Sequence, residues 1–266
     1  MEVAMADLGL VSVVMPCYRA GATLKRSVDG VIAQSYIHWE LWLMVDGAGD
    51  DTTVLAWQLA KLDERIKVVV SEKNRGVSRS RNLGMRLSKG EWIAFCDADD
   101  RWLPNKLALQ MEAMAMDAAN LCCSAFAFYY PETGGLMPVQ TREYIDYGVL
   151  LQTNPIPLST AVFGRGLLPG CAFPDRLGKY IHEDYAFWLQ LFQRNAVKAV
   201  YLKTVTTEIT QMRDSRSSNK WLALRSHGHI LRTVGGISGL AWCGLMLSYV
   251  WHGSLKRFLG KFTRKA

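Results

Sequence analysis

The first hundred residues alternate short apolar runs with segments of helical periodicity, and this alternation constrains the fold more than any other feature. Short apolar runs bounded by polar turns predict buried strands, and strands that alternate with helices predict a mostly parallel sheet covered by helices. We therefore expect an α/β fold. The predicted strands are Val11–Met15, Glu40–Val45, Ile66–Val70 and Trp92–Cys96, and the predicted helices are Thr23–Gln34, Thr52–Lys61 and Ser78–Leu87.

The same kinds of segment continue to about residue 210, without repeats or low-complexity tracts. Pro104 is typical of the first turn of a helix. A chain of 266 residues is long enough for one large domain with an appendage. The later predicted elements are a helix over Leu103–Ala119, strands over Cys122–Tyr130, Ser159–Phe163 and Val197–Leu202, and a helix that begins near Glu183.

The positive charge of the chain is concentrated in its last quarter. Residues 201–266 contain 11 Lys and Arg against 2 Asp and Glu, whereas residues 1–200 contain 20 against 22. A nucleic-acid-binding protein would usually spread its basic groups over a docking face, but here they flank an apolar stretch. We therefore expect contact with an anionic membrane surface and no nucleic-acid partner.

The apolar stretch Thr233–Trp251 has 19 residues without a charge. As a helix it would measure roughly 28 Å, close to the ~30 Å of a bilayer core. Four glycines dilute it, and a crossing would place the basic tail on the wrong side for the positive-inside tendency. We favour an interfacial or re-entrant segment, with a true span as the alternative. The acidic N-terminus is not a signal peptide, and the six cysteines form no Cys-x-x-Cys pair, so we expect a cytoplasmic location.

Acidic residues follow two of the predicted strands. Open α/β sheets bind ligands beyond the carboxyl ends of their strands. Asp97 and Asp99 would lie on the same side of an extended backbone, and paired carboxylates favour Mg²⁺ or Mn²⁺. The alternative is an acidic turn that caps the helix at Pro104, with Asp100 as the capping residue.

Three further polar positions allow both a ligand-binding and a structural interpretation. Asp46 precedes a glycine-rich turn and could accept a hydrogen bond from a nucleobase or a sugar, or the turn could simply cap the next helix. Arg81 could pair with the acids or hold a diphosphate, or it could be a surface charge. Asp184 opens a helix, where carboxylates are favoured by the helix dipole alone.

Taken together, these segments resemble the inverting glycosyltransferases of family 2, which have the GT-A fold. Five motifs occur in the expected order and cover most of the first 190 residues. They read VSVVMPCYRA, QSYIHWELWLMVDGAGDDT, NRGVSRSRNLG, GEWIAFCDADDRWLPNKL and HEDYAFWLQLF.

The resemblance implies that a nucleotide-diphospho-sugar, above all a UDP-sugar, lies across the strand ends. Asp46 would contact the base, Asp97 the ribose and Asp99 the Mg²⁺ or Mn²⁺ ion that bridges the diphosphate, while Asp184 would be the general base. Arg19, Val45 and the Gly47–Asp50 turn depart from the family pattern, mainly where the base would bind. The remaining donor-binding candidates are Pro16, Tyr18, Gly76, Arg81 and, from a late polar loop, Arg213.

The resemblance also implies a division of the chain and a location. We expect a catalytic domain over residues 1–205, with a donor-binding half (1–110) and an acceptor-side half (111–205), and a membrane-associated extension over 206–266. The acceptor would be a lipid-linked or lipopolysaccharide-type glycan at the cytoplasmic face of the inner membrane, where the protein is peripheral or monotopic. The alternative is a noncatalytic nucleotide-sugar or glycan-binding module, or an accessory membrane component of polysaccharide assembly.

Overall fold

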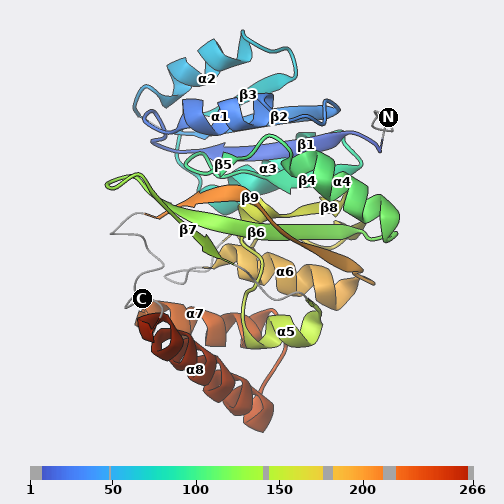
Figure 1. Cartoon of the computed structure of the whole chain (residues 1–266), viewed down its shortest axis with the longest axis vertical. Helices are drawn as coiled ribbons and strands as arrows, with labels where there is room; N and C mark the ends of the chain where they lie inside the picture. Colours follow the sequence, from blue (N-terminus) through green and yellow to red (C-terminus); the bar gives the residue numbers. More distant parts are fainter. Residues whose placement is uncertain (1–7, 48, 140–143, 176–181, 212–219, 263–266) are drawn as a thin grey trace.

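The computed structural model describes residues 8–47, 49–139, 144–175, 182–211 and 220–262, the last twelve of these by their backbone only. A nine-stranded sheet is covered by helices on both faces, and two further helices lie beyond α5 and α6 at one end of the molecule (Figure 1). The α/β fold predicted from the sequence is confirmed.

The first part of the sheet is parallel, as the alternation of strands and helices predicts. Its strands lie in the order β3-β2-β1-β4, so that β1 has β2 on one side and β4 on the other. The strands are β1 (Val11–Cys17), β2 (Trp39–Asp46), β3 (Ile66–Ser71) and β4 (Trp92–Phe95), and the connecting helices are α1 (Leu24–Ile32), α2 (Thr52–Ala60) and α3 (Val77–Leu87).

The second part of the sheet is mixed and continues the order as β8-β6-β9-β5, with β7 paired to β6. β8 is antiparallel to both of its neighbours, β4 and β6, and β6 is parallel to β9, so β8 runs opposite to the strands on either side of it. The strands are β5 (Arg101–Trp102), β6 (Leu121–Tyr130), β7 (Gly135–Val139), β8 (Val162–Gly164) and β9 (Ala199–Thr210), and the helices are α4 (Lys106–Met116), α5 (Tyr147–Gln152) and α6 (Glu183–Arg194).

Two of the predicted strands differ from the observed ones. The strand predicted over Ser159–Phe163 begins as a 3-10 turn (Leu158–Thr160), and β8 follows it. β9 extends to Thr210 rather than Leu202, because it follows β6 past an irregularity in their register and pairs with it up to Tyr129. The strand therefore runs through residue 205, at which we expected the catalytic domain to end.

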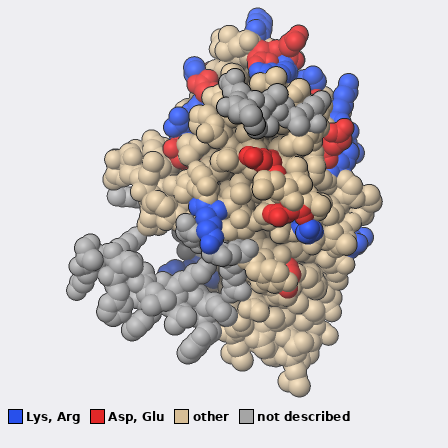
Figure 2. Space-filling view, turned by 45° about the vertical axis from the view of Figure 1, so that its right-hand side comes forward, with Lys and Arg blue, Asp and Glu red and all other residues tan. Residues whose placement is uncertain are grey.

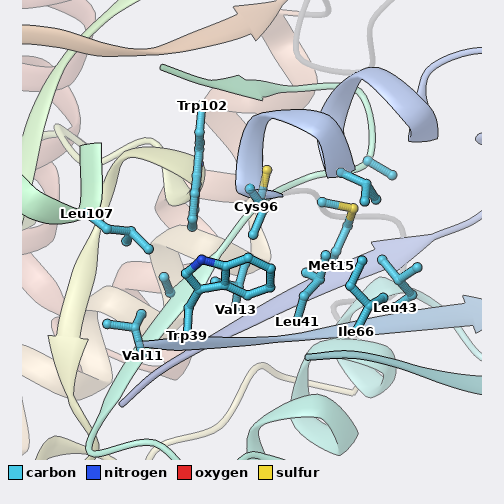
Figure 3. Packing of buried hydrophobic residues seen from close by; sticks show 14 of the residues in the cluster. Val11, Val13, Met15, Trp39, Leu41, Leu43, Ile66, Cys96, Trp102 and Leu107 are labelled. Carbon is cyan, nitrogen blue, oxygen red and sulfur yellow. The ribbon is translucent and has the colours of Figure 1, made fainter. Parts of the chain in front are cut away.

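The two faces of the sheet bury two separate apolar clusters. One lies under α1, α2 and α4, where Trp39, Trp102 and Leu107 pack against the β1 side chains Val13 and Met15 (Figure 3). The other lies under α3 and α6 and contains a group of packed aromatic rings. Because both faces are covered, the central strands read as continuous apolar runs in the sequence.

The chain ends in a pair of helices, α7 (Lys220–Thr233) and α8 (Gly239–Phe262), which we call the C-terminal hairpin. The hairpin divides the predicted 19-residue apolar stretch, because Gly236 and Gly239 adopt the positive φ angles of a turn between the helices. None of the helices in the described part of the chain is long and apolar enough to span a membrane.

α8 leaves part of its apolar surface uncovered. Trp242, Leu245 and Met246 pack toward the second apolar cluster, whereas Leu240 is 92% exposed and Leu247 is 73% exposed. In the view of Figure 2, Lys, Arg, Asp and Glu gather over the upper part of the molecule, and the described surface at the lower end is mostly uncharged.

Candidate functional site

The fold brings the acidic segments to one edge of the sheet. Asp46 is the last residue of β2, and Asp97 follows β4 by two residues. β1 lies between these strands and is parallel to both, and it ends at Cys17 beside Pro16 and Tyr18. This is the edge at which open α/β sheets bind their ligands.

Asp46 holds the turn that precedes α3. Its carboxylate is 5% exposed and accepts hydrogen bonds from the backbone N–H groups of Arg75, at 2.8 Å, and Gly76, at 2.7 Å. Gly76 has a φ of 95°, so a side chain there would strain the turn. A cleft of about 270 Å³ beside these residues is lined by Val45, Asp46, Ser71, Arg75 and Ser80, among others. The sequence did not reveal this structural role of Asp46.

Asp97 and Asp99 lie in a turn, not in the extended backbone that we expected. The turn is closed by the Asp100 N–H, which donates to the Asp97 carbonyl at 3.0 Å. β4 ends at Phe95 because the backbone of Asp97 no longer follows the sheet and its N–H donates to Ser159 Oγ instead. The two carboxylates nevertheless remain close enough to interact electrostatically.

The side chains of the turn differ in their environment. Asp99 retains an exposed surface, yet crowding by protein atoms and the charge of Asp97 raise the pKa of Asp99 to about 6. Asp100 is buried, and burial together with the two neighbouring acids raises the pKa of Asp100 well above its usual range. Asp100 accepts a hydrogen bond from the Thr210 N–H of β9, so it anchors a distant strand and does not cap the following helix.

Arg26 and Thr210 fasten this turn from outside. The Arg26 guanidinium donates to the Asp99 carbonyl and to Thr210 Oγ1 and pairs with Glu208 at 2.6 Å. Thr210 Oγ1 also donates to the Asp99 carbonyl. Sequence reasoning missed Arg26 and Thr210, because α1 and β9 are far from the turn along the chain and no motif marks them.

Asp184 lies in the first turn of α6, one residue after Glu183. Its Oδ2 atom accepts a hydrogen bond from Asn154 Nδ2 at 2.8 Å. Burial and the neighbouring charge of Glu183 raise the pKa of Asp184, although His182 and Arg81 lower it. A helix start favours the charged form of a carboxylate and so predicts a lowered pKa, but the net direction at Asp184 is upward, because of burial and the charge of Glu183.

Arg81 connects the two sets of acids. Its Nη2 lies 2.7 Å from Asp97 Oδ1, and its Nη1 lies 2.9 Å from Glu183 Oε1. We call Asp97, Asp99, Asp100, Glu183 and Asp184 the acidic cluster. Because one guanidinium touches both Asp97 and Glu183, the start of α6 lies beside the end of β4.

The other candidates differ in what the structure says of them. Tyr18 is 46% exposed at the end of β1, with the Arg19 guanidinium 5.4 Å from the centre of its ring. Pro16 lies within β1 and pairs with Met44 of β2. Arg213 lies outside the described residues.

Three aromatic rings join α6 to the C-terminal hairpin. The His227 ring of α7 stacks on Tyr185 of α6, with centroids 4.9 Å apart, and on Tyr249 of α8, with centroids 4.1 Å apart. We call these three residues the aromatic stack. Tyr185 directly follows Asp184, so the stack holds α6 at the turn that carries two members of the acidic cluster, Glu183 and Asp184.

The acidic cluster offers oxygen ligands of the kind that Mg²⁺ and Mn²⁺ prefer. No group of three or more His, Cys, Asp and Glu side chains in the described ranges is arranged to hold a metal ion by itself. The exposed carboxylate of Asp99 still fits such an ion, because Mg²⁺ is commonly held by one or two carboxylates together with substrate phosphates.

The sheet, covered by helices on both faces and with acids at one edge, has the α/β architecture of the GT-A glycosyltransferases. The family described as Glycosyl transferase family 2 matches residues 12–169, and the chain belongs to this family. The UDP-Glc:alpha-D-GlcNAc-diphosphoundecaprenol beta-1,3-glucosyltransferase WfgD of Escherichia coli is 30% identical over 225 residues, which are 84% of this chain and 85% of that protein. The resemblance seen in the sequence motifs is thereby confirmed.

Solved structures support the fold independently. TarS 1-349 of S. aureus in complex with UDP-GlcNAc has a TM-score of 0.70 at 16% identity, over 91% of this chain and 71% of that one. The mannosyltransferase PcManGT of Pyrobaculum calidifontis, in complex with GDP-Man and Mn²⁺, has a TM-score of 0.65 at 16% identity, over 94% of this chain and 75% of that one.

Proposed function

We propose that the protein is a metal-dependent inverting glycosyltransferase that moves one sugar from a UDP-sugar to a lipid-linked or lipopolysaccharide-type glycan. The observation that carries this proposal is the Arg81 contact with both Asp97 and Glu183, which brings Asp184 next to the Asp97–Asp100 turn. A donor held at the turn would then present its anomeric carbon toward Asp184.

The donor would lie across the ends of β1, β2 and β4. Asp97 would hold the ribose through Oδ2, because Oδ1 pairs with Arg81. Asp99 would hold the divalent ion, which when bound offsets the negative charge that develops on the departing diphosphate. Pro16, Tyr18 and Gly76 would shape the nucleotide site. The positions at which the sequence departs from the family pattern, Val45 and Gly47–Asp50, lie in the same region.

Asp184 would be the general base. As the acceptor oxygen bonds to the anomeric carbon, the bond from that carbon to the diphosphate breaks, and the acceptor's hydroxyl proton passes to the Asp184 carboxylate. One in-line displacement inverts the configuration of the anomeric carbon. A pKa of Asp184 raised by burial and Glu183 makes its carboxylate a stronger base than an exposed aspartate. Asn154 would orient it through the hydrogen bond to Oδ2.

The C-terminal hairpin would bring the protein to its acceptor. Leu240 and Leu247 expose apolar surface on α8, and the sequence that follows contains Lys256, Arg257 and Lys261. Apolar side chains and nearby basic groups together favour the interface of an anionic membrane. WfgD is named for transfer to a diphosphoundecaprenol-linked sugar, which supports a lipid-linked acceptor. The protein would then act at the cytoplasmic face of the inner membrane as a peripheral or monotopic protein.

A transfer assay tests this proposal. The full chain is incubated with Mn²⁺, each of a panel of nucleotide-sugars and a GlcNAc-diphospho-lipid acceptor, and NMR determines the anomeric configuration of the product. We expect transfer from a UDP-sugar, inversion, and loss of activity with EDTA. Binding of a UDP-sugar without transfer or hydrolysis, across acceptors of several glycan classes, would instead support a noncatalytic binding module.

A further inference from the structure

Arg81 is buried, and both of its terminal nitrogens already have carboxylate partners. The side chain is 5% exposed, with Asp97 at 2.7 Å from Nη2 and Glu183 at 2.9 Å from Nη1. The guanidinium lies 5.3 Å from the centre of the Phe173 ring, which covers one of its sides. The position of Arg81 is therefore set by three parts of the chain: the end of β4, the start of α6 and the segment before residue 176.

The charges around Arg81 explain why it stays there. Burial alone would lower the pKa of Arg81, but the carboxylates of Asp97 and Glu183 outweigh burial and raise it. Without a cation between them, Asp97 and Glu183 would repel each other, and removal of one partner from a buried ion pair is strongly destabilising. The guanidinium thus holds together two acidic segments that otherwise would move apart.

We propose that Arg81 is a positioning residue, which fixes the start of α6 against the end of β4 so that Asp184 faces the donor, and that it does not itself bind the donor diphosphate. This inference rests on the proposed function. It differs from the donor-binding role that the family resemblance implies for Arg81, because a residue that binds the diphosphate has to be accessible to the donor, whereas the Arg81 side chain is 5% exposed.

Two variants with a matched control test the proposal. Arg81→Met removes the charge and keeps an unbranched apolar side chain, and Glu183→Gln removes the charge of the partner on α6. Arg194→Met is the control, because Arg194 is an exposed arginine at the end of α6 opposite Glu183. The affinity for UDP with Mn²⁺ is measured by calorimetry, and kcat and its pH profile are measured with saturating UDP-sugar.

A positioning role predicts that the loss of Arg81 lowers kcat and leaves the affinity for UDP nearly unchanged. We expect Arg81→Met to change the Kd for UDP by less than about fivefold and to lower kcat by about 100-fold, whereas Arg194→Met changes neither. The acid limb of the kcat profile should move to higher pH in Arg81→Met, because Arg81 lowers the pKa of Asp184, and to lower pH in Glu183→Gln, because Glu183 raises it. A tenfold or greater loss of UDP affinity in Arg81→Met, or an unchanged kcat, overturns the proposal.

A double-mutant cycle makes the test independent of activity. Chemical denaturation gives the free energy of unfolding of Arg81→Met, Glu183→Gln and the double variant. Residues in one ion-pair network are coupled, so the effects on stability should be non-additive. Additive effects overturn the proposal.

If the wild-type chain binds UDP but transfers no sugar, the proposed function fails. Coupling between the two variants with retained UDP affinity would still support Arg81 as the residue that joins the two segments. If Arg81→Met does not fold, kcat and its pH profile in Glu183→Gln test the proposal instead: a shift of the acid limb to lower pH supports it, and an unchanged kcat and profile overturn it.

Discussion

The acidic cluster and the C-terminal hairpin are held to the same sheet by different forces. At the acidic cluster, Arg81 and Arg26 connect separate elements through ion pairs and hydrogen bonds of defined geometry. At the hairpin, the contacts are apolar, and the aromatic stack centred on His227 joins α6, α7 and α8. Ion pairs fix particular atoms in place, whereas apolar packing is non-directional.

This difference matches what each region has to do in the proposed reaction. A base has to lie within hydrogen-bond reach of the proton that it accepts, so the acidic cluster needs exact atomic positions. A surface that rests on lipid needs exposed apolar area and no fixed partner, as α8 has at Leu240 and Leu247. The following experiments separate the two regions, beginning with the largest expected effect.

Loss of the proposed base should abolish sugar transfer and leave donor binding intact. We expect Asp184→Asn to lower kcat by about 1,000-fold, since general base catalysis contributes about 10²–10⁴-fold. The Kd for UDP should stay within about twofold of the wild type, because in the proposed reaction Asp184 contacts the acceptor and not the nucleotide. Rate measurements at saturating donor and calorimetry with UDP check this, and a matching loss of UDP affinity would instead assign Asp184 a structural role.

Removal of the proposed metal ligand should affect both binding and rate. We expect Asp99→Asn to lower kcat/KM by about 100-fold and to raise the Mn²⁺ concentration needed for half-maximal activity, because the ion loses its carboxylate ligand. Titration of activity with Mn²⁺ measures both quantities. Full transfer with an unchanged dependence on Mn²⁺ would show that the ion, if needed, binds elsewhere.

The aromatic stack should make stability depend on pH. Burial, together with the nearby His182, lowers the pKa of His227 to about 4, so the unfolded chain binds more protons between about pH 6.5 and 4. The stabilising contribution of neutral His227 is complete above that window and is lost as the pH falls through it, by about 3 kcal/mol in total.

The variant His227→Phe keeps an aromatic ring but cannot be protonated. We expect its free energy of unfolding to fall less than that of the wild type between pH 7 and pH 4, as measured by urea denaturation. If the free energy of unfolding of the two proteins changes by the same amount between pH 7 and pH 4, the folded structure does not hold His227 neutral.

Charges on the exposed face of α8 should weaken membrane binding and leave the acidic cluster intact. We expect the double change Leu240→Asp and Leu247→Asp to lower partitioning onto phosphatidylglycerol vesicles by about tenfold, because apolar burial is lost and anionic lipid repels the new charges. The control is Leu62→Asp, since Leu62 is 70% exposed just beyond α2. Co-sedimentation measures the partitioning, and equal binding by all three proteins would remove α8 from the membrane contact.

Local periodicity was enough to predict most of the fold. β1 to β4 and α1 to α3 lie within a few residues of their predicted positions, because each has an apolar pattern that a short window contains. The end of β9 was predicted eight residues too early, because its second half is held by pairing with β6, and that partner is not visible in the sequence of β9 itself.

The site could be predicted as a set of residues but not as a geometry. The order of the motifs indicated Asp46, Asp97, Asp99 and Asp184, yet the turn at Asp97 depends on contacts with Ser159 and Thr210, which are 62 and 111 positions away from the residues that they contact. The prediction that Arg81 could pair with nearby acids is confirmed for Asp97, but no pattern in the sequence indicated its second partner, Glu183, 102 positions later. Contacts over such distances follow from the tertiary fold and not from any local pattern.

The central claim is that the acidic cluster binds a nucleoside diphosphate through a divalent cation at Asp99. Thermal unfolding of the full chain with UDP, with and without Mn²⁺, tests it most directly. At a UDP concentration about 100 times the Kd, we predict an increase in Tm of about 5 °C or more with Mn²⁺. The increase should be much smaller with EDTA and in Asp99→Asn. An equal increase with and without the ion, or in Asp99→Asn, would contradict the account.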